Sequence, residues 1–221
     1  MLRIGHRGAA GHAPENTLLA IEKAIALGVD FVELDLQRTC DGHMIIMHDK
    51  RVDRTTNGSG CVAQMKLDQL RKLDAGDGQS VPTLEDVLDR CRGRTGLMLE
   101  IVSQGSAEQV LRTVSKHDFR GPVIFASFLH AEVLRIKQIQ RSAVTLALLE
   151  GVPVHSTDFA TQAEVSHVGL SIDSLTSDIL RSLKSNGFGV FVYTVNDPRD
   201  IIWLSSLGAD GVISDFPERV T

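Results

Sequence analysis

Two histidines, an arginine and two carboxylates lie within the first 49 residues, each in or near the end of a run typical of a β-strand. His6 and Arg7 follow the first such run, Glu33 and Asp35 lie in F-V-E-L-D-L-Q, and His48 ends M-I-I-M-H. Imidazoles transfer protons, a guanidinium binds phosphate through paired hydrogen bonds, and carboxylates hold metal ions. These are the groups needed for metal-assisted cleavage of a phosphate ester.

The two carboxylates are spaced to act together. Glu33 and Asp35 are two residues apart, so on a strand both point to one face while Leu34 and Leu36 point to the other. The apolar neighbours suggest a strand buried on both faces, which argues against a solvated edge. Two like charges facing a packed interior are costly unless a cation lies between them. Oxygen ligands without an adjacent Cys or His favour one divalent cation, Mg²⁺ or Ca²⁺, over zinc.

Nine blocks of the sequence resemble the glycerophosphodiester phosphodiesterase family, in the family's order and through essentially the whole chain. A lone H-R-G would be weak evidence, whereas nine ordered blocks are specific. The resemblance implies hydrolysis of a glycerophosphodiester to glycerol 3-phosphate and an alcohol such as choline or ethanolamine. The blocks are I-G-H-R-G-A-A-G-H-A-P-E-N-T (4–17), V-E-L-D-L-Q (32–37), D-G-H-M-I-I-M-H-D (41–49), D-R-T-T-N-G-S-G (53–60), V-P-T-L-E-D-V-L (81–88), L-E-I (99–101), A-S-F (126–128), V-Y-T-V-N-D (192–197) and G-V-I-S-D-F-P (211–217).

The resemblance also implies roles for particular residues. Glu100, in the L-E-I block, matches the family's third metal carboxylate, beside Glu33 and Asp35. His6 and His48 would act on opposite sides of an in-line displacement, one taking a proton and the other giving one. The sequence does not say which histidine does which. The nucleophile is either water or the adjacent glycerol hydroxyl, which would form a cyclic phosphate first.

Structural alternatives are open for several of these residues. Arg7 is either a bidentate ligand of the phosphate or an ion-pair partner of Glu33 or Asp35. Tyr193 stands where the family often has a tryptophan, so we expect it to line the substrate pocket unless it is a core aromatic. The histidines could be satisfied core side chains, and the glutamate of L-E-I could be a structural ion pair. Two histidines at strand ends beside carboxylates favour the functional interpretation.

One position departs from the family pattern. The family usually reads E-I-K where this chain has Glu100-Ile101-Val102. A lysine there would face the same side as Glu100 and supply a cation near the phosphate, where charge stabilisation matters most. The departure bears on rate and substrate more than on the reaction class.

Strand-like runs that alternate with helical patterns predict an α/β fold, a (β/α)₈ TIM barrel formed by residues 1–221 as one domain. Catalytic groups collect at the carboxyl ends of such strands. We expect a small insertion after the second strand, at about 38–80, with a hairpin-like M-I-I-M strand. The polar segment 150–164 predicts a shortened helix, and Asn16 is expected to cap the first helix. The expected strands are Leu2–His6, Phe31–Gln37, Leu97–Val102, Val123–Ser127, Val144–Leu149, Val165–Ser171, Gly189–Val195 and Gly211–Ser214; the expected helices are Asn16–Leu27, Leu84–Arg92, Ala107–His117, Ala131–Gln140, Thr176–Asn186 and Pro198–Leu207.

Composition narrows the classes of partner. The chain has 221 residues, 43% hydrophobic content and a formal charge of −5, which gives no basic field and argues against nucleic acid as a partner. No apolar run approaches the ~20 residues needed to span a bilayer, and we expect no signal peptide within these residues, since removing one would destroy the His6 motif. The three cysteines are odd in number and lack metal spacing, as expected of reduced thiols in a cytoplasmic protein. The partner we expect is a small glycerophosphodiester; the sequence does not indicate an oligomeric state.

Three other functions compete. A lysophospholipase D would share the catalytic set but need an apolar groove at the barrel mouth, to which Phe128, Leu129 and Met65 could contribute. A catalytically impaired binding protein of the same fold is suggested by Val102. An enolase-type barrel is a weaker rival, because the expected strand ends carry no lysine base.

Overall fold

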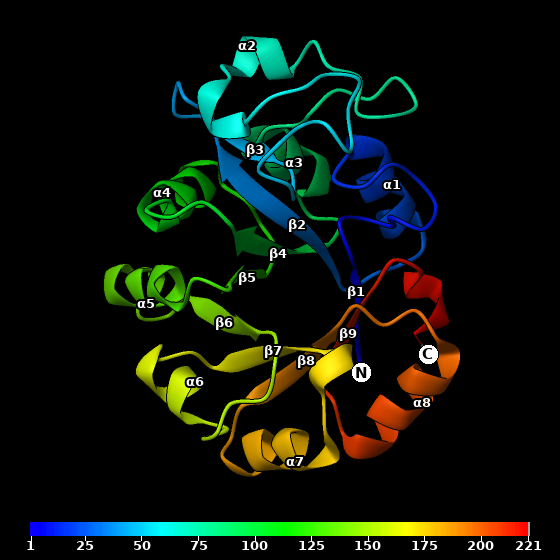
Figure 1. The fold of residues 1–221 in the computed structure, drawn as a ribbon, viewed down its shortest axis with the longest axis vertical. Coiled ribbons are helices and arrows are strands. Elements are labelled where there is room, and N and C mark those ends of the chain that lie inside the picture. The colour runs from blue at the N-terminus through cyan, green and yellow to red at the C-terminus, as the bar shows by residue number, and fades with distance from the viewer. Residues whose placement is uncertain (221) are drawn as a thin grey trace.

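The computed structural model describes residues 1–220, which form a closed parallel β-barrel surrounded by helices (Figure 1). Strand pairing follows the order β1-β2-β4-β5-β6-β7-β8-β9, and β9 closes the ring on β1. The TIM-barrel prediction is confirmed, and the expected strands all form with ends shifted by at most two residues. The barrel strands are β1 Leu2–Gly5, β2 Phe31–Arg38, β4 Gly96–Ile101, β5 Val123–Ser127, β6 Val144–Leu149, β7 His167–Ser171, β8 Gly189–Tyr193 and β9 Gly211–Ser214.

Helices cover the outside of the ring between most strands (Figure 1). The six expected helices are present, and the polar 150–164 segment forms only the short α6, as predicted. Gly208 ends α8 in the left-handed conformation (φ 80°) that favours glycine. The helices are α1 Leu18–Ala26, α3 Leu84–Cys91, α4 Ala107–Lys116, α5 His130–Ile139, α6 Asp158–Gln162, α7 Ser177–Ser185 and α8 Pro198–Leu207, with 3₁₀ turns at Ile172–Ser174 and Pro217–Arg219.

The prediction that Asn16 caps the first helix is wrong. Thr17 is the N-cap, and its hydroxyl accepts a hydrogen bond from Ala20 N–H. Asn16 lies one residue earlier in the left-handed region (φ 57°), with its side chain buried. The Asn16 side chain instead donates a hydrogen bond to a carboxylate of the candidate site.

The segment between β2 and α3 forms the predicted insertion, which lies beyond the carboxyl end of β2 and contains α2 (Figure 1). The expected M-I-I-M strand is β3 (Met44–Ile46), which pairs antiparallel with the end of β2. A 3₁₀ turn (Val62–Gln64) and the short α2 (Leu67–Leu70) follow. Because the insertion has its own cluster of buried side chains, it can hold loop residues rigidly against the barrel. That cluster comprises Ile45, Met47, Val52, Val62, Leu70, Ala75 and Val81.

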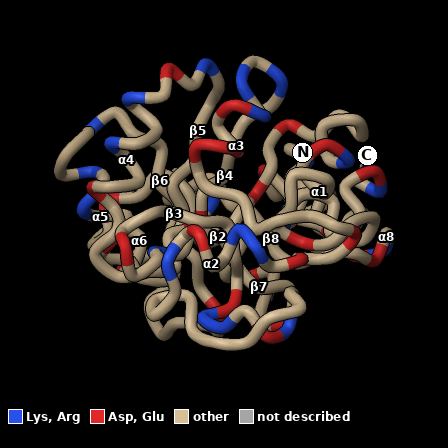
Figure 2. Tube along the Cα trace, turned by 90° about the horizontal axis from the view of Figure 1, so that it is seen from above, with Lys and Arg blue, Asp and Glu red and all other residues tan. Residues whose placement is uncertain are grey.

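Apolar side chains fill the barrel beneath its carboxyl end. Phe31 of β2 and Met98 of β4 belong to this interior layer, with Ile4, Ile124, Leu146, Phe191 and Ile213. Two larger clusters pack the outer faces of the strands against the helices. None of the helices within residues 1–220 is long and apolar enough to cross a membrane. Lysines and arginines are spread over many loops and helices rather than along one stripe (Figure 2).

Candidate active site

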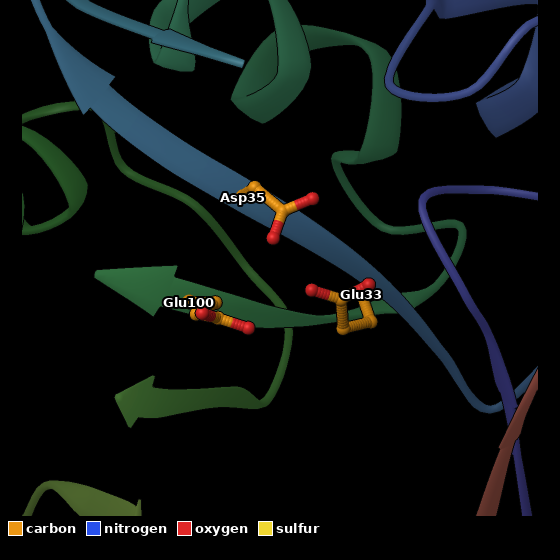
Figure 3. Close-up of side chains that lie close together, drawn as sticks. All are labelled: Glu33, Asp35 and Glu100. Carbon is orange, nitrogen blue, oxygen red and sulfur yellow. The ribbon is translucent and has the colours of Figure 1, made fainter. Parts of the chain in front are cut away.

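Three carboxylates converge at the carboxyl end of β2 and β4 (Figure 3). The strand register places Asp35 directly opposite Glu100, and Glu33 lies two residues earlier on the same face of β2. One oxygen from each of the three lies within 4.8 Å of the others. Glu33 and Asp35 are almost completely buried. The period-two spacing thus aims both β2 carboxylates into the barrel, and the neighbouring strand adds the third.

Burial and mutual repulsion make it unfavourable for all three carboxylates of this cluster to be ionised without a cation. Burial, and then repulsion from Asp35 and Glu100, raises the pKa of Glu33 well above its usual range. Burial and the charge of Asp35 raise the pKa of Glu100 to about 8. Glu33 Oε2 accepts the backbone N–H of Arg7 at 3.0 Å, whereas Oε1 is buried without a hydrogen-bond partner among the described residues. Three converging carboxylates, one of which has an unsatisfied oxygen, fit a divalent cation such as Mg²⁺ or Ca²⁺.

Both histidines line the same cavity, and a carboxylate holds each by Nδ1. His6, directly after β1, contacts Asp215 at 2.7 Å, and Asp215 also accepts a 2.7 Å hydrogen bond from Asn196. His48 contacts Asp49 at 2.7 Å. An ionised carboxylate only accepts hydrogen bonds, so Nδ1 carries the proton and the Nε2 lone pair remains for proton transfer. Sequence reasoning missed Asp215, although an acidic residue directly after the last strand was a signal.

Arg7 lies between the carboxylates and a second ionic cluster. Its Nη1 donates to Glu15 at 2.7 Å, and its Nε lies 3.4 Å from Asp35. Arg54, from the insertion, donates to both oxygens of Glu15 at 2.7 and 2.8 Å and to both oxygens of Asp49 at 2.7 and 2.9 Å. Asp35 is one of the two ion-pair partners considered for Arg7, and it lies at 3.4 Å; the shorter contact, to Glu15 at 2.7 Å, was not predicted. Sequence reasoning missed Arg54, which links Glu15, the partner of Arg7, to Asp49, the partner of His48.

Asn16 orients a carboxylate of the cluster. Its side-chain Nδ2 donates to Asp35 Oδ2 at 2.8 Å, and its Oδ1 accepts the Asp35 backbone N–H at 3.4 Å. The left-handed backbone of Asn16 is uncommon for a non-glycine residue, and asparagine tolerates it better than most. The buried carboxylate needs a donor more than the helix needs this cap, which explains the error in the helix-start prediction.

The site opens into a cavity of about 410 Å³. Tyr193 lines it, as expected, and so does Phe128. Leu129 and Met65 are not among its lining residues, and Met65 packs in the insertion instead. Two of the three side chains considered for the apolar groove of a lysophospholipase D therefore do not contribute to the cavity. A more open cleft of about 550 Å³ borders the insertion, but it contains none of the predicted site residues.

Val102 lies one residue beyond β4, is partly buried, and is not among the described residues that line the cavity. Arg7 is the one lysine or arginine among those lining residues. Among the described residues that line the cavity, the Arg7 guanidinium is therefore the one cation that could replace the lysine that the family pattern has at Val102.

Comparison with known proteins shows the family of this chain. The sequence pattern described as the glycerophosphoryl diester phosphodiesterase family matches residues 6–219. The chain belongs to this family. It is 35% identical over 247 residues to a glycerophosphodiester phosphodiesterase of Bacillus subtilis (strain 168), covering 99% of this chain and 84% of that protein. It is 33% identical over 232 residues to one from Caldanaerobacter subterraneus, covering 99% and 96%.

Solved structures give the same result. A phosphodiesterase of Oleispira antarctica, solved in complex with the product sn-glycerol-3-phosphate, aligns with a TM-score of 0.92 at 26% identity, covering 98% of this chain and 94% of that one. A glycerophosphodiester phosphodiesterase of Agrobacterium tumefaciens aligns with a TM-score of 0.83 at 25% identity, covering 100% and 99%. The prediction of an enzyme is confirmed: the chain is a phosphoric diester hydrolase of the glycerophosphodiester class.

Proposed function

We propose that this hydrolase is metal-dependent and converts glycerophosphodiesters to glycerol 3-phosphate and an alcohol. One observation carries the proposal: three converging carboxylates, with one buried unsatisfied oxygen, share a cavity with two histidines that are each oriented by an aspartate. That combination matches a site that must hold a cation and exchange two protons. The sn-glycerol-3-phosphate bound by the Oleispira antarctica protein is a product of this reaction class.

Glu33, Asp35 and Glu100 would hold one Mg²⁺ or Ca²⁺. When bound, such an ion polarises a phosphoryl oxygen and screens the charge of the phosphate. Asn16 keeps Asp35 in place through its 2.8 Å hydrogen bond, so the carboxylate oxygens are pre-organised before a ligand arrives. The unpartnered oxygen of Glu33 marks where the positive charge is required.

His6 and His48 would supply the acid and the base. Each imidazole has its Nδ1 held at 2.7 Å from an aspartate, which fixes the ring and leaves Nε2 to receive or give a proton. The histidine that is neutral when substrate binds takes the proton of the nucleophile. The protonated one gives a proton to the leaving oxygen. Arg7, whose guanidinium lines the cavity, would bind a non-bridging oxygen of the phosphate.

The test is direct. Purified protein with Mg²⁺ or Ca²⁺ is offered glycerophosphocholine and lysophosphatidylcholine, and choline and glycerol 3-phosphate are measured separately. We expect choline and glycerol 3-phosphate in equal amounts from the first substrate, and little choline from the second. Choline release from lysophosphatidylcholine alone would support the lysophospholipase D instead, and release from neither would support the binding protein. The cytoplasmic location remains a prediction from the sequence.

A further inference from the structure

The wall of the cavity that faces the metal-binding carboxylates has its own chemistry. In the ring of eight strands, β6 and β7 lie across from β1 and β2. Glu150 is the first residue after β6, and Asp173 lies in the turn that follows β7. Phe128 follows β5 and Tyr193 ends β8, and all four side chains line the cavity. Two aromatic rings therefore share the wall opposite Glu33 with two carboxylates.

The two carboxylates of this wall are not neutralised by the protein. Five carboxylates line the cavity, and the proposed cation accounts for Glu33, Asp35 and Glu100. Within residues 1–220, neither the Glu150 nor the Asp173 carboxylate forms an ion pair or a hydrogen bond at the site, and the one guanidinium lining the cavity, that of Arg7, pairs with Glu15. The wall is left with excess negative charge next to aromatic surface.

The geometry of this wall is fixed by neighbouring hydrogen bonds. The N–H of Gly151 donates to Ser174 Oγ at 3.0 Å, which ties the loop carrying Glu150 to the turn carrying Asp173. The Tyr193 hydroxyl donates to the Leu149 carbonyl at 3.0 Å, so it is already engaged within the protein. Phe128 and Tyr193 meet edge to face, with ring centroids 5.8 Å apart. Burial, and then the charge of Glu150, raises the pKa of Tyr193, so this neutral ring stays beside an anion.

Aromatic faces and unpaired carboxylates both attract a cationic group. Phe128 is 44% exposed, which leaves a large apolar side chain against solvent unless a ligand covers it. A quaternary ammonium gains from the ring quadrupole and from the negative field together. A neutral polyol or an anionic group gains from neither.

We propose that Phe128, Tyr193, Glu150 and Asp173 form the subsite for the leaving alcohol and select diesters whose alcohol carries an ammonium or quaternary ammonium group. The inference rests on the proposed function, because the phosphate must lie between this wall and the carboxylates of β2 and β4. A diester with glycerol on one side and a cationic alcohol on the other is zwitterionic, and it matches the cavity: positive metal and guanidinium at one wall, negative charge at the other. A cavity of about 410 Å³ is within the usual size range for such ligands.

The kinetic test compares two substrates of similar size, glycerophosphocholine and glycerophosphoglycerol, whose leaving alcohols differ in charge. The wild-type enzyme should prefer the choline diester in kcat/KM. Glu150→Gln and Asp173→Asn should each lower the choline-to-glycerol ratio by about 2- to 5-fold, and the double variant by about 4- to 25-fold, because both carboxylates are exposed and screened. Tyr193→Leu should lower the ratio by a similar amount through loss of the cation–π contact. Asp178→Asn, on the exposed face of α7, is the matched control and should leave the ratio unchanged.

A binding arm keeps this inference separate from the proposed function. Choline and its neutral carbon isostere, 3,3-dimethylbutan-1-ol, are titrated into the metal-loaded protein and followed by NMR. Choline should bind more tightly to the wild type, and the difference should shrink in the double variant and at high salt. Active enzyme with no choline preference, or with a preference that the double variant keeps, overturns the subsite and leaves the proposed function intact. Inactive enzyme that binds choline through Glu150 and Asp173 overturns the proposed function and keeps the subsite; equal binding of the two alcohols overturns the subsite in either case.

Discussion

Arg54 offers a prediction that separates positioning from stability. It is outside the catalytic cavity, yet its guanidinium makes four hydrogen bonds of 2.7 to 2.9 Å to the carboxylates of Glu15 and Asp49. Those carboxylates hold Arg7 and His48. Replacing Arg54 by glutamine should therefore release both groups at once without touching the substrate.

The expected sizes of the two effects differ. The Arg54 side chain is 48% exposed, and exposed ion pairs stabilise by about 0.2–1 kcal/mol each. Two such pairs predict a loss of about 0.4–2 kcal/mol, or roughly 1–8 °C in Tm for a chain of this length. The rate should fall further, by about 10- to 100-fold in kcat, because small displacements of a proton-transfer group are costly. Arg54 also holds the pKa of Asp49 well below its usual range, so the stability difference should be full above pH about 4 and shrink as the pH falls further.

The assay measures kcat, KM and Tm for Arg54→Gln, Arg54→Lys and Arg51→Gln. Arg51 is a matched control, since it pairs with Asp53 on the same loop at similar exposure but contacts no site residue. Arg54→Lys should recover part of kcat, and added methylguanidinium should partly rescue Arg54→Gln. The reasoning is refuted if Arg54→Gln loses no more kcat than Arg51→Gln. It is also refuted if the wild type, heated until its free energy of unfolding equals that of Arg54→Gln, shows the same loss of kcat.

Three further outcomes are expected. His6→Ala or His48→Ala should each lose roughly 10²–10⁴ in kcat with metal binding kept, and the double variant should lose less than the product, measured by steady-state kinetics and calorimetry. Since the pKa values of Glu33 and Glu100 are raised, the metal-free folded protein holds protons that the unfolded chain gives up, and its Tm should fall as pH rises from about 4.5 to 8. Over the same range the metal affinity, measured by calorimetry, should rise about tenfold per pH unit for each proton displaced. Val102→Lys should raise kcat/KM for glycerophosphodiesters, and an unchanged or lower value in a folded, metal-binding variant would mean that Arg7 already supplies the charge.

The β-strand periodicity was sufficient to predict part of the site. Glu33 and Asp35 follow from spacing and burial alone, because a strand directs alternate residues to one face. Glu100 required the family resemblance, since no local pattern states that β4 pairs with β2 in the register that sets it opposite Asp35. Strand register is a property of the whole barrel rather than of any segment.

Contacts between residues that are far apart in sequence could not be predicted from local sequence patterns. His6 and Asp215 are separated by 209 residues in sequence and meet because β9 closes on β1. Arg54 reaches its carboxylates from a loop whose position depends on the packing of the insertion. Asn16 was assigned to a cap on good local grounds, but a buried carboxylate required the same side chain. In each case a tertiary contact, which local sequence patterns do not show, determines the role of the side chain.

The central claim is that three carboxylates hold a cation required for turnover. Its most direct test is glycerol 3-phosphate release from glycerophosphocholine by protein stripped with EDTA and then titrated with Mg²⁺ or Ca²⁺, for the wild type and Asp35→Asn. We predict no turnover in the stripped protein, saturable recovery on adding metal, and a recovery midpoint at least about 10-fold higher in the variant. Full turnover by demonstrably metal-free wild-type protein would contradict the account.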